Sequence, residues 1–217
     1  MVVVILGVWP LFQGKMTAEE SSPGVIVGAF SKGTMEGWEP KEFESRTLYR
    51  IAQVDGRSAL EAVSRASASG LVKQIRVDLE KYPYINWQWR IENRLAGSFD
   101  ERQKSGDDYA ARIYVIASGG IAIWNTRALN YVWARHEEKG SVWNNAYAGK
   151  RAVMKAVRSG GDPVSVWQSE KRNIKKDLET RFGRKIRYID AVALMSDTDN
   201  TGKSVTAFYG DIYFTAE

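Results

Sequence analysis

The chain has 217 residues, 44% of them hydrophobic and 26% charged, which is the composition of a folded protein and excludes disorder over most of its length. Because it has no cysteine and a single histidine, disulfide frameworks, zinc-thiolate sites and thiol nucleophiles are excluded, and Ser-His-Asp catalysis is disfavoured. The net charge of +5 comes from Lys and Arg scattered among Asp and Glu, so we expect no nucleic-acid partner, whereas an acidic polymer remains open.

Residues 1–12, MVVVILGVWPLF, form an apolar run as long as a signal-peptide core and too short to span a bilayer. A positively charged start is missing, and Ala18 marks only a weak cleavage site. Two interpretations stay open for residues 1–18: a signal-peptide remnant, which we favour, or a first β-strand. A signal peptide would place the protein in the bacterial periplasm or at the cell surface, and neither interpretation includes a transmembrane span.

Most segments after residue 25 are short, rich in β-branched and aromatic residues, and often alternate apolar with polar positions, which is typical of strands. Glycine, Asn, Asp and Ser separate them, and no spacing suits a βαβ unit. The sequence therefore predicts a single all-β domain over residues 25–217, an antiparallel β-sandwich of the jelly-roll kind. The predicted strands are 47–54, 58–64, 72–79, 85–91, 109–117, 129–134, 152–158, 188–195 and 206–214.

One segment departs from this pattern. In SVWQSEKRNIKKDLETRFG (165–183) the apolar residues lie near helical spacing, and the segment ends in Gly183, a favourable residue for a helix C-cap. We expect one short α-helix near residues 169–182, with an extended start over residues 170–173 as the alternative.

Alternation within the strands assigns side chains to opposite faces. In INWQWRI (85–91), Trp87 and Trp89 share the core face with the terminal isoleucines. If the strands that carry the outward-facing residues belong to one sheet, these residues line a surface of charges and aromatic rings, the pattern of a sugar-binding face. The alternative is an outer face that carries only cross-strand ion pairs. The outward-facing residues are Arg90, Asp108, Arg112, Tyr209, Asp211 and Tyr213.

The stretch DTDNTG (197–202) places Asp197, Asp199 and Asn200 before a glycine, which resembles the first half of a calcium loop. The pattern then fails, because Thr201 stands at the third ligand position and Phe208 at the twelfth, so an EF-hand is rejected. Three interpretations stay open: the rim of a polar ligand site, an irregular Ca²⁺ loop held by the two aspartates, or a plain turn. No cofactor is required in any of them.

The motif SEKRN (169–173) places Glu170 beside two cations, which keeps the carboxylate ionised and suits a nucleophile or base. The alternative is a capped, solvated helix start. If the protein is an enzyme, the catalytic candidates are Glu170, Asp108 and Asp211, since glycoside hydrolysis needs two carboxyls spaced across a site. Trp143 is expected to be exposed for stacking. The ligand-binding candidates are Arg90, Lys104, Arg112, Trp143, Asn144, Arg172, Asn173, Asp197, Asp199, Asn200 and Tyr209.

An ordered set of motifs carries a resemblance to a known family. The motifs are SASGL (67–71), INWQWR (85–90), KSGDDYAARIYV (104–115), LNYVW (129–133), SEKRN (169–173), FG (182–183), SDTDNTG (196–202) and YGDIYF (209–214). Together they resemble a bacterial, mostly exported family known as domain of unknown function three-zero-four-seven, from about residue 25 to the end. The resemblance implies export and a single domain. It brings no established activity, substrate or catalytic residue with it. The motif YGDIYF is also similar to the closing strand of jelly-roll carbohydrate-binding modules.

These features lead to three functional hypotheses. The first is an exported protein that binds a carbohydrate or related cell-envelope polymer, with an acidic polymer suggested by Arg90, Arg112 and Arg172. The second is a polysaccharide-active enzyme, either a glycoside hydrolase or a lyase, with a carboxylate and arginine site. The third is a calcium-stabilised envelope interaction protein, in which Asp197 and Asp199 serve stability alone.

Overall fold

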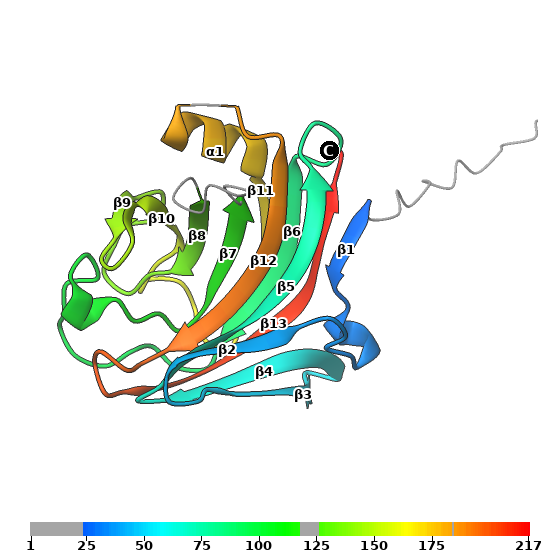
Figure 1. Ribbon diagram of the computed structural model, residues 1–217. Coiled ribbons are helices and arrows are strands. Elements are labelled where there is room, and N and C mark those ends of the chain that lie inside the picture. The colour runs from blue at the N-terminus through cyan, green and yellow to red at the C-terminus, as the bar shows by residue number, and fades with distance from the viewer. Residues whose placement is uncertain (1–23, 118–125, 184) are drawn as a thin grey trace, which may run out of the picture.

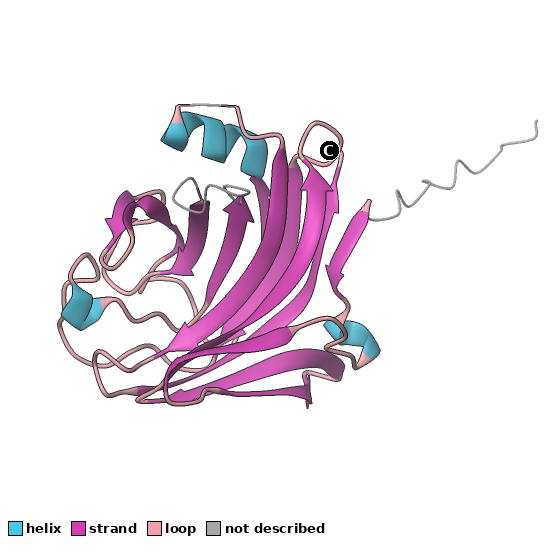
Figure 2. Ribbon diagram, viewed as in Figure 1, coloured by secondary structure: helices cyan, strands magenta, loops and turns pink. Residues whose placement is uncertain are grey.

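The computed structural model describes residues 24–117, 126–183 and 185–217, and strands dominate these residues (Figure 1, Figure 2). The hypotheses for residues 1–18 lie outside the described residues. Sheet A contains β1 (Val25–Gly28), β3 (Leu48–Val54), β4 (Arg57–Arg65), β6 (Tyr84–Ile91), β11 (Gln168–Asn173) and β13 (Ser204–Thr215). Sheet B contains β2 (Glu39–Glu44), β5 (Ala68–Asp78), β7 (Arg112–Ala117), β8 (Arg127–Trp133), β9 (Val142–Asn145), β10 (Gly149–Arg158) and β12 (Tyr188–Asp197).

The two sheets form a sandwich, which confirms the predicted fold class. Sheet A has the order β11-β6-β13-β4-β3, with β1 on β13, and sheet B has the order β2-β5-β12-β7-β8-β10-β9. Every pairing among the described residues is antiparallel except that of β8 with β10, which is parallel. The hairpin of β9 and β10 therefore extends sheet B at one edge, and β2 ends it at the other.

Aromatic side chains from both sheets fill the space between them. Trp87 and Trp89 on β6 are almost fully buried, as alternation predicts. Their rings meet those of β8 across the core, with centroid distances of 5.4 Å from Trp87 to Tyr131 and 5.8 Å from Trp89 to Trp133. Burial of such large rings is the main favourable contribution to the stability of a sandwich of this kind.

Strand β13 carries a bulge that the sequence did not reveal. Tyr209 pairs with Trp89 and Ile212 with Trp87, so one extra residue on β13 lies opposite β6. The bulge reverses the alternation: Tyr209 is fully buried in the core, whereas Asp211 points outward. The prediction that Tyr209 faces outward is therefore wrong, because a two-residue period cannot be carried through a bulge.

The predicted surface of charges and aromatics is divided between two faces. Strand β7, which carries Arg112, belongs to sheet B, whereas β6 and β13, which carry Arg90 and Asp211, belong to sheet A. In a sandwich the outer faces of the two sheets point in opposite directions. The outward-facing residues therefore contribute to two separate surfaces instead of one.

The helix α1 (Ile174–Phe182) follows β11, so the extended start over residues 170–173 is correct. Asn173 is its N-cap and accepts a hydrogen bond from the Lys176 amide, 2.9 Å away. Gly183 ends the helix with φ of 64°, a conformation that favours glycine. Two short 3₁₀ helices, η1 (Phe30–Lys32) and η2 (Lys104–Gly106), complete the fold. No helix among the described residues combines the length and apolarity needed to cross a membrane.

Candidate functional site

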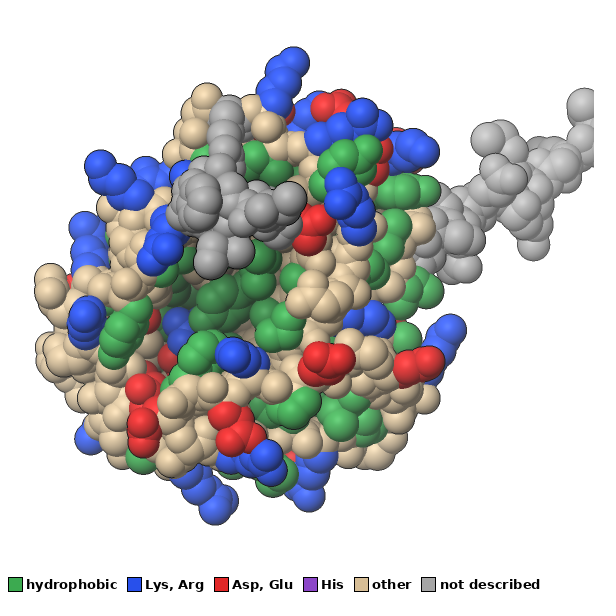
Figure 3. Space-filling view, in the orientation of Figure 1, with side chains coloured by type: hydrophobic (Ala, Val, Ile, Leu, Met, Phe, Trp, Pro, Cys, Tyr) green, Lys and Arg blue, Asp and Glu red, His purple; other side chains and the backbone are tan. Residues whose placement is uncertain are grey.

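A groove of about 440 Å³ lies on the outer face of sheet B. In the space-filling view it is the hollow at the centre of the molecule, with hydrophobic side chains on its floor (Figure 3). Two exposed aromatic rings belong to its walls: Phe43 on β2, 66% exposed, and Tyr147 after β9, 57% exposed. These rings come from opposite edges of sheet B, so the groove spans the sheet.

Alternation along the central strands builds the floor of the groove. The neighbours Ile113 and Val115 face the core, so Arg112 and Tyr114 on β7 face the groove. The cross-strand partner of Arg112 on β12 is Met195, and that of Tyr114 on β8 is Asn130. The same two-residue period that fills the core with apolar side chains therefore places polar groups among the apolar side chains of the floor.

Arg112 is the central charge of the floor, and it is 4% exposed. Its guanidinium donates a hydrogen bond to Asp197, and a second nitrogen lies 3.9 Å from the carboxylate of Asp107. Burial is the largest influence on the pKa of Arg112 and acts to lower it, but the charges of Asp197 and Asp107, together with the neighbouring tyrosines, outweigh burial and raise it. Burial also raises the pKa of Asp107 and of Asp197, while Arg112 opposes both shifts.

Several polar atoms on the floor have no hydrogen-bond partner among the described residues. They are Asp107 Oδ1, Arg112 Nε and Asn130 Oδ1, and all three are buried. The other carboxylate oxygen of Asp107 accepts a hydrogen bond from the Asn145 side chain, 3.0 Å away. Because leaving buried polar groups unpaired costs about 1–3 kcal/mol each, the floor retains an unused capacity for hydrogen bonds to a ligand.

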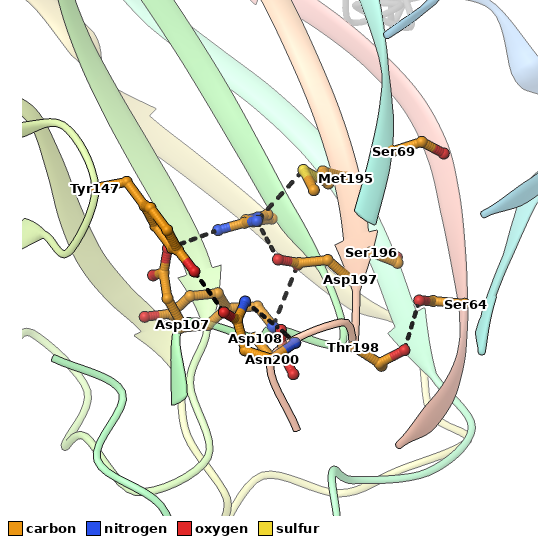
Figure 4. Close-up of polar contacts among 12 residues, drawn as sticks. Ser64, Ser69, Asp107, Asp108, Tyr147, Met195, Ser196, Asp197, Thr198 and Asn200 are labelled. Atoms are coloured by element: carbon orange, nitrogen blue, oxygen red, sulfur yellow. Dashed lines mark hydrogen bonds and ion pairs between the residues drawn. The ribbon is translucent and has the colours of Figure 1, made fainter. Parts of the chain in front are cut away.

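The DTDNTG loop forms part of the rim, and Asp108 holds it in place. The fully buried Asp108 carboxylate accepts hydrogen bonds from the backbone amides of Asn200 and Thr201, at 3.3 Å and 2.7 Å. The Asn200 side chain in turn accepts a hydrogen bond from the Tyr147 hydroxyl, 2.5 Å away (Figure 4). Asp199 and Asn200 themselves line the groove. The loop is therefore more than a plain turn, since Asp108 anchors it and it contacts the Tyr147 wall of the groove.

The same loop brings three carboxyls together. Asp108, Asp197 and Asp199 each offer an oxygen, and these oxygens lie within 4.8 Å of one another. Buried Asp199 Oδ1 and Thr201 Oγ1 have no hydrogen-bond partner among the described residues. Oxygen donors at this spacing suit Ca²⁺, but the oxygens of Asp108 and Asp197 already accept hydrogen bonds from amides or from Arg112. The donor set therefore fits a divalent cation only in part.

The remaining candidates of sheet A do not reach the groove. Arg90 forms ion pairs with Asp55 and Glu92 on the outer face of sheet A. Asp211 accepts hydrogen bonds from the amide and hydroxyl of Ser31, at 2.8 Å and 2.6 Å. Glu170 forms an ion pair with Arg158, and burial raises the pKa of Glu170.

Four further candidates have structural roles or lie on the periphery. Arg172 contacts Asp177 at 3.3 Å, and Asn173 is the N-cap of α1. Asn144 accepts a hydrogen bond from Arg181. The ammonium of Lys104 lies 5.2 Å from the ring of Tyr147 at the outside of the groove.

The prediction that Trp143 is exposed is wrong. Its ring is 6% exposed and packs in a small cluster with Tyr109 and Met154 beneath the hairpin of β9 and β10. Side chains of β9 alternate between exposed and buried. In an edge strand of four residues, the sequence alone does not show which alternate set is the buried one.

Sequence reasoning also missed members of the groove: Phe43, Asp107, Asn130 and Tyr147. Alternation along LNYVW could have found Asn130, because the flanking Leu129 and Tyr131 are core residues. The others lie in loops or in an exposed edge strand, where no period applies.

Comparisons with known proteins agree with this fold. The profile of the family described as "Protein of unknown function (DUF3047)" matches residues 36–213. A search of curated protein sequences found no match. Among solved structures, the chain is similar to a mutated Cel12A cellulase derived from Rhodothermus marinus, with 10% identity, a TM-score of 0.51 and coverage of 87% of this chain and 95% of that one.

Two other solved structures are less similar in TM-score. One is CBM28, a carbohydrate-binding module specific for non-crystalline cellulose, with 14% identity, a TM-score of 0.48 and coverage of 87% of this chain and 93% of that one. The other is the glycoside hydrolase domain of Endo-D from Streptococcus pneumoniae, with 8% identity, a TM-score of 0.44 and coverage of 83% of this chain. The chain spans 22% of that last structure. The likeness to the Cel12A cellulase, at 10% identity, indicates a common fold and leaves the function to the site.

Proposed function

The chain belongs to the DUF3047 family of proteins of unknown function, and from that premise we propose that its groove binds the sugar units of a carbohydrate or related cell-envelope polymer. One observation carries the proposal. The side chains that line the groove between the exposed rings of Phe43 and Tyr147 include three with a buried polar atom that has no hydrogen-bond partner among the described residues. A sugar has both apolar C–H faces and hydroxyl groups, so it complements such a surface.

The hydroxyl group is suited to this floor because it both donates and accepts hydrogen bonds. Asp107 Oδ1 can only accept, and Arg112 Nε can only donate. Two neighbouring hydroxyls of one sugar ring would satisfy both atoms, whereas an apolar ligand would leave them unpaired at a cost in affinity. The walls then contribute stacking energy, since Tyr147 is held by Asn200 at its hydroxyl.

The charge of the groove supports a neutral polymer in place of the acidic one suggested by the sequence. Arg90 and Arg172 lie outside the groove, so Arg112 is the one cation that lines it among the described residues. The negative charges of an acidic polymer would lie close to carboxylates of the groove that no cation balances, and the two would repel each other. The carboxyls that line the groove are Glu44, Asp107, Asp197 and Asp199.

The proposal is tested by a glycan array and by electrophoresis in gels that contain soluble neutral polysaccharides. The variant Tyr147→Ala should weaken binding by at least tenfold, because it removes one wall. Its matched control is Tyr188→Ala, which removes a half-buried ring that is stacked under arginines and lines no part of the groove. Absence of binding to every glycan, or equal binding by both variants, would contradict the proposal.

The second candidate function is an enzyme that cleaves such a polymer. It is favoured by Asp107, a buried carboxyl on the floor whose raised pKa suits a proton donor. The earlier catalytic candidates are engaged elsewhere: Asp108 holds the loop, Asp211 holds Ser31, and Glu170 pairs with Arg158. Release of oligosaccharides that stops in Asp107→Asn, while binding persists, would support an enzyme. Binding without any product would support the binding protein.

We also propose that Ca²⁺ can occupy the site at Asp108 and Asp199, supported by the unpartnered oxygens of Asp199 and Thr201. Calcium would then stabilise the rim of the groove. Melting is measured with Ca²⁺ and with a chelator, in the wild type and in Asp199→Asn. A rise in melting temperature with Ca²⁺ that is lost in the variant supports the site, and identical melting curves contradict it.

The proposed ligand fits the export expected from the family resemblance. We therefore propose a location in the bacterial periplasm or at the cell surface, where envelope polymers occur. Fractionation of cells that produce the full-length protein tests this proposal, and recovery in the cytoplasmic fraction alone would contradict it.

A further inference from the structure

A second pocket, here called the outer pocket, lies on the outer face of sheet A and has a volume of about 400 Å³. It extends over the strands β11, β6, β13 and β4, which are adjacent in the sheet. The groove lies on sheet B, so the two sheets of the sandwich separate the two sites. The proposed function does not use this pocket. Its lining includes Arg57, Gln88, Trp167, Lys171, Asp211 and Tyr213.

The bulge in β13 makes room for the pocket. Gly210 lies at the bulge, and a Cβ atom at this position would come within 3.1 Å of the Gln88 Cβ. A larger residue would therefore narrow the pocket. The bulge also turns Asp211 outward, where Ser31 fixes its carboxylate through two hydrogen bonds. Bulges that redirect side chains in this way are common next to functional sites.

Trp167 forms a rigid wall of the pocket. The guanidinium of Arg57 lies 3.6 Å from the centroid of its ring, and this cation–π contact holds the ring in place. The preceding loop is fixed as well: Ser165 has φ of 57°, donates its amide proton to Ile91 and its hydroxyl proton to Glu92. The indole Nε1 of Trp167 is buried and has no hydrogen-bond partner among the described residues.

Amide and hydroxyl groups form the floor. Gln88 is fixed at both ends, by Arg57 at 2.8 Å and by Ser169 at 3.0 Å. The Tyr213 hydroxyl and the Lys171 ammonium line the pocket without a hydrogen bond to another described residue. The Tyr213 hydroxyl and the exposed Lys171 ammonium, which lies 5.0 Å from the centroid of the Tyr84 ring, are therefore available to a ligand beside the ring of Trp167.

The lining of the outer pocket carries charges of both signs. Arg57 and Lys171 are matched in number by Glu170 and Asp211, and Glu170 also forms an ion pair with Arg158 behind the lining, so the net charge is small and a charged ligand gains little over a neutral one. The aromatic wall requires an apolar face, and the free donors and acceptors require hydroxyls. A neutral sugar ring has both.

From this geometry we infer that the outer pocket is a second saccharide site, which takes a neutral, hydroxyl-rich sugar against Trp167. Because the two sites lie on opposite sheets, one short oligosaccharide cannot fill both. The protein would then hold two polymer chains, or two segments of one chain, and binding to a polymer would gain from this bivalency.

The inference is tested by ¹⁹F NMR on protein that contains 5-fluorotryptophan at all eight tryptophans, with the Trp167 signal assigned from Trp167→Phe. The probes are cellohexaose, xylohexaose, laminarihexaose and mannohexaose. At least one probe should shift the Trp167 signal in a saturable way, and it should do so in Tyr147→Ala as well as in the wild type. A Trp167 shift that disappears in Tyr147→Ala would be an effect transmitted from the groove and would overturn the inference.

Polysaccharide gels separate the failure of this inference from failure of the proposed function. Two sites predict partial retardation in Trp167→Ala and in Tyr147→Ala, and loss of retardation in the double variant, with Tyr188→Ala as control. If Trp167→Ala behaves as the wild type while Tyr147→Ala abolishes binding, the groove stands and the outer pocket is refuted. If the reverse holds, the outer pocket stands and the groove is refuted. If no probe or polysaccharide binds, both are refuted.

Discussion

Arg112 places a buried guanidinium between the carboxyls of Asp107 and Asp197, and the three groups are more than nine-tenths buried. Taking charges out of water costs several kcal/mol for each ion, so the cluster is tolerated only while opposite charges stay together. The arrangement orders the floor of the groove more than it stabilises the fold. Within this cluster the acceptor Asp107 Oδ1 is buried and has no hydrogen-bond partner among the described residues.

The first prediction concerns this cluster. Arg112→Met leaves two buried carboxyls without a cation, and we expect it to lower the free energy of unfolding by about 3–5 kcal/mol at pH 7. Urea denaturation measures the change. The matched control is Arg90→Met, because Arg90 is similarly buried but its partners Asp55 and Glu92 are 57% and 30% exposed. Equal losses in both variants would contradict the special role of the groove cluster.

The second prediction is a pH dependence of opposite sign at two aspartates. Burial, followed by the charge of Asp108, raises the pKa of Asp199 above its ordinary value of 3.8. The stability gained from the neutral form is present below pH 3.8 and is lost as the pH rises through the folded-state pKa. The unfolding free energy of the wild type should therefore fall relative to that of Asp199→Asn between pH 4 and pH 7.

Asp177 provides the contrast. Burial acts to raise its pKa, but the hydrogen bonds from Lys155 and Tyr131, together with the charges of Lys155 and Arg172, outweigh burial and lower it. Its stabilising effect is present above pH 3.8 and is lost as the pH falls through the folded-state pKa. Asp177→Asn should therefore be most destabilising at neutral pH and least so in acid. Urea titrations at several pH values measure both trends, and parallel curves for the two variants would refute the assignment.

At the scale of the elements, the strand β13 supports the groove, whereas the helix α1 does not. Tyr209 on β13 crosses between the sheets: its hydroxyl donates to the Met195 carbonyl at 2.8 Å and accepts from the Arg112 amide at 3.3 Å. A residue expected to bind ligand thus supports the floor of the groove from beneath. Helix α1, in contrast, buries Ile174 and Leu178 against the core and takes no part in lining the groove.

The third prediction tests the role of Asn173. Because its side chain caps α1 instead of contacting a ligand, Asn173→Ala should lower the free energy of unfolding by about 1 kcal/mol and leave glycan affinity unchanged. Asn144→Ala is the control, since that side chain only accepts a hydrogen bond from Arg181 at the surface. Loss of glycan binding in a folded Asn173→Ala protein would restore Asn173 as a ligand-binding residue.

At the scale of the whole molecule, net charge and site charge have opposite signs. The chain carries +5, whereas four carboxyls and one guanidinium line the groove. The excess of cations therefore lies on other surfaces, where its interactions with polyanions are weak and easily screened by salt. The bulk charge of the protein thus says little about the ligand of the groove.

The fourth prediction follows from this separation. At low ionic strength, polygalacturonate should retard the protein through its scattered cations, and the effect should vanish near about 0.15 M salt, where the Debye length is about 8 Å. Retardation by a neutral polysaccharide that binds the groove should change little over the same range. Salt-resistant binding to polygalacturonate that depends on Tyr147 would show that the groove takes an acidic polymer.

Particular residues show how far prediction from sequence could go. Alternation placed Trp87 and Trp89 in the core, because the side chains of a regular strand alternate between its two faces whatever its neighbours are. The strand β2, with the sequence EPKEFE, was missed because it is wholly exposed, and the polar strand β11 was predicted only as an alternative extended start over residues 170–173. Of the candidate site residues, Arg112, Asp197, Asp199 and Asn200 do lie together in the groove.

The sequence by itself determined the features that depend on neighbours along the chain. These are the alternation of the central strands, the helix that ends at Gly183, and the turn chemistry of DTDNTG. Only the tertiary structure decided which strands share a sheet, which face of β13 carries Tyr209, and which charged side chains contact one another. The physical reason is the range of the contacts: Arg112 and Asp197 are 85 residues apart, and only the packing of β7 against β12 brings them together.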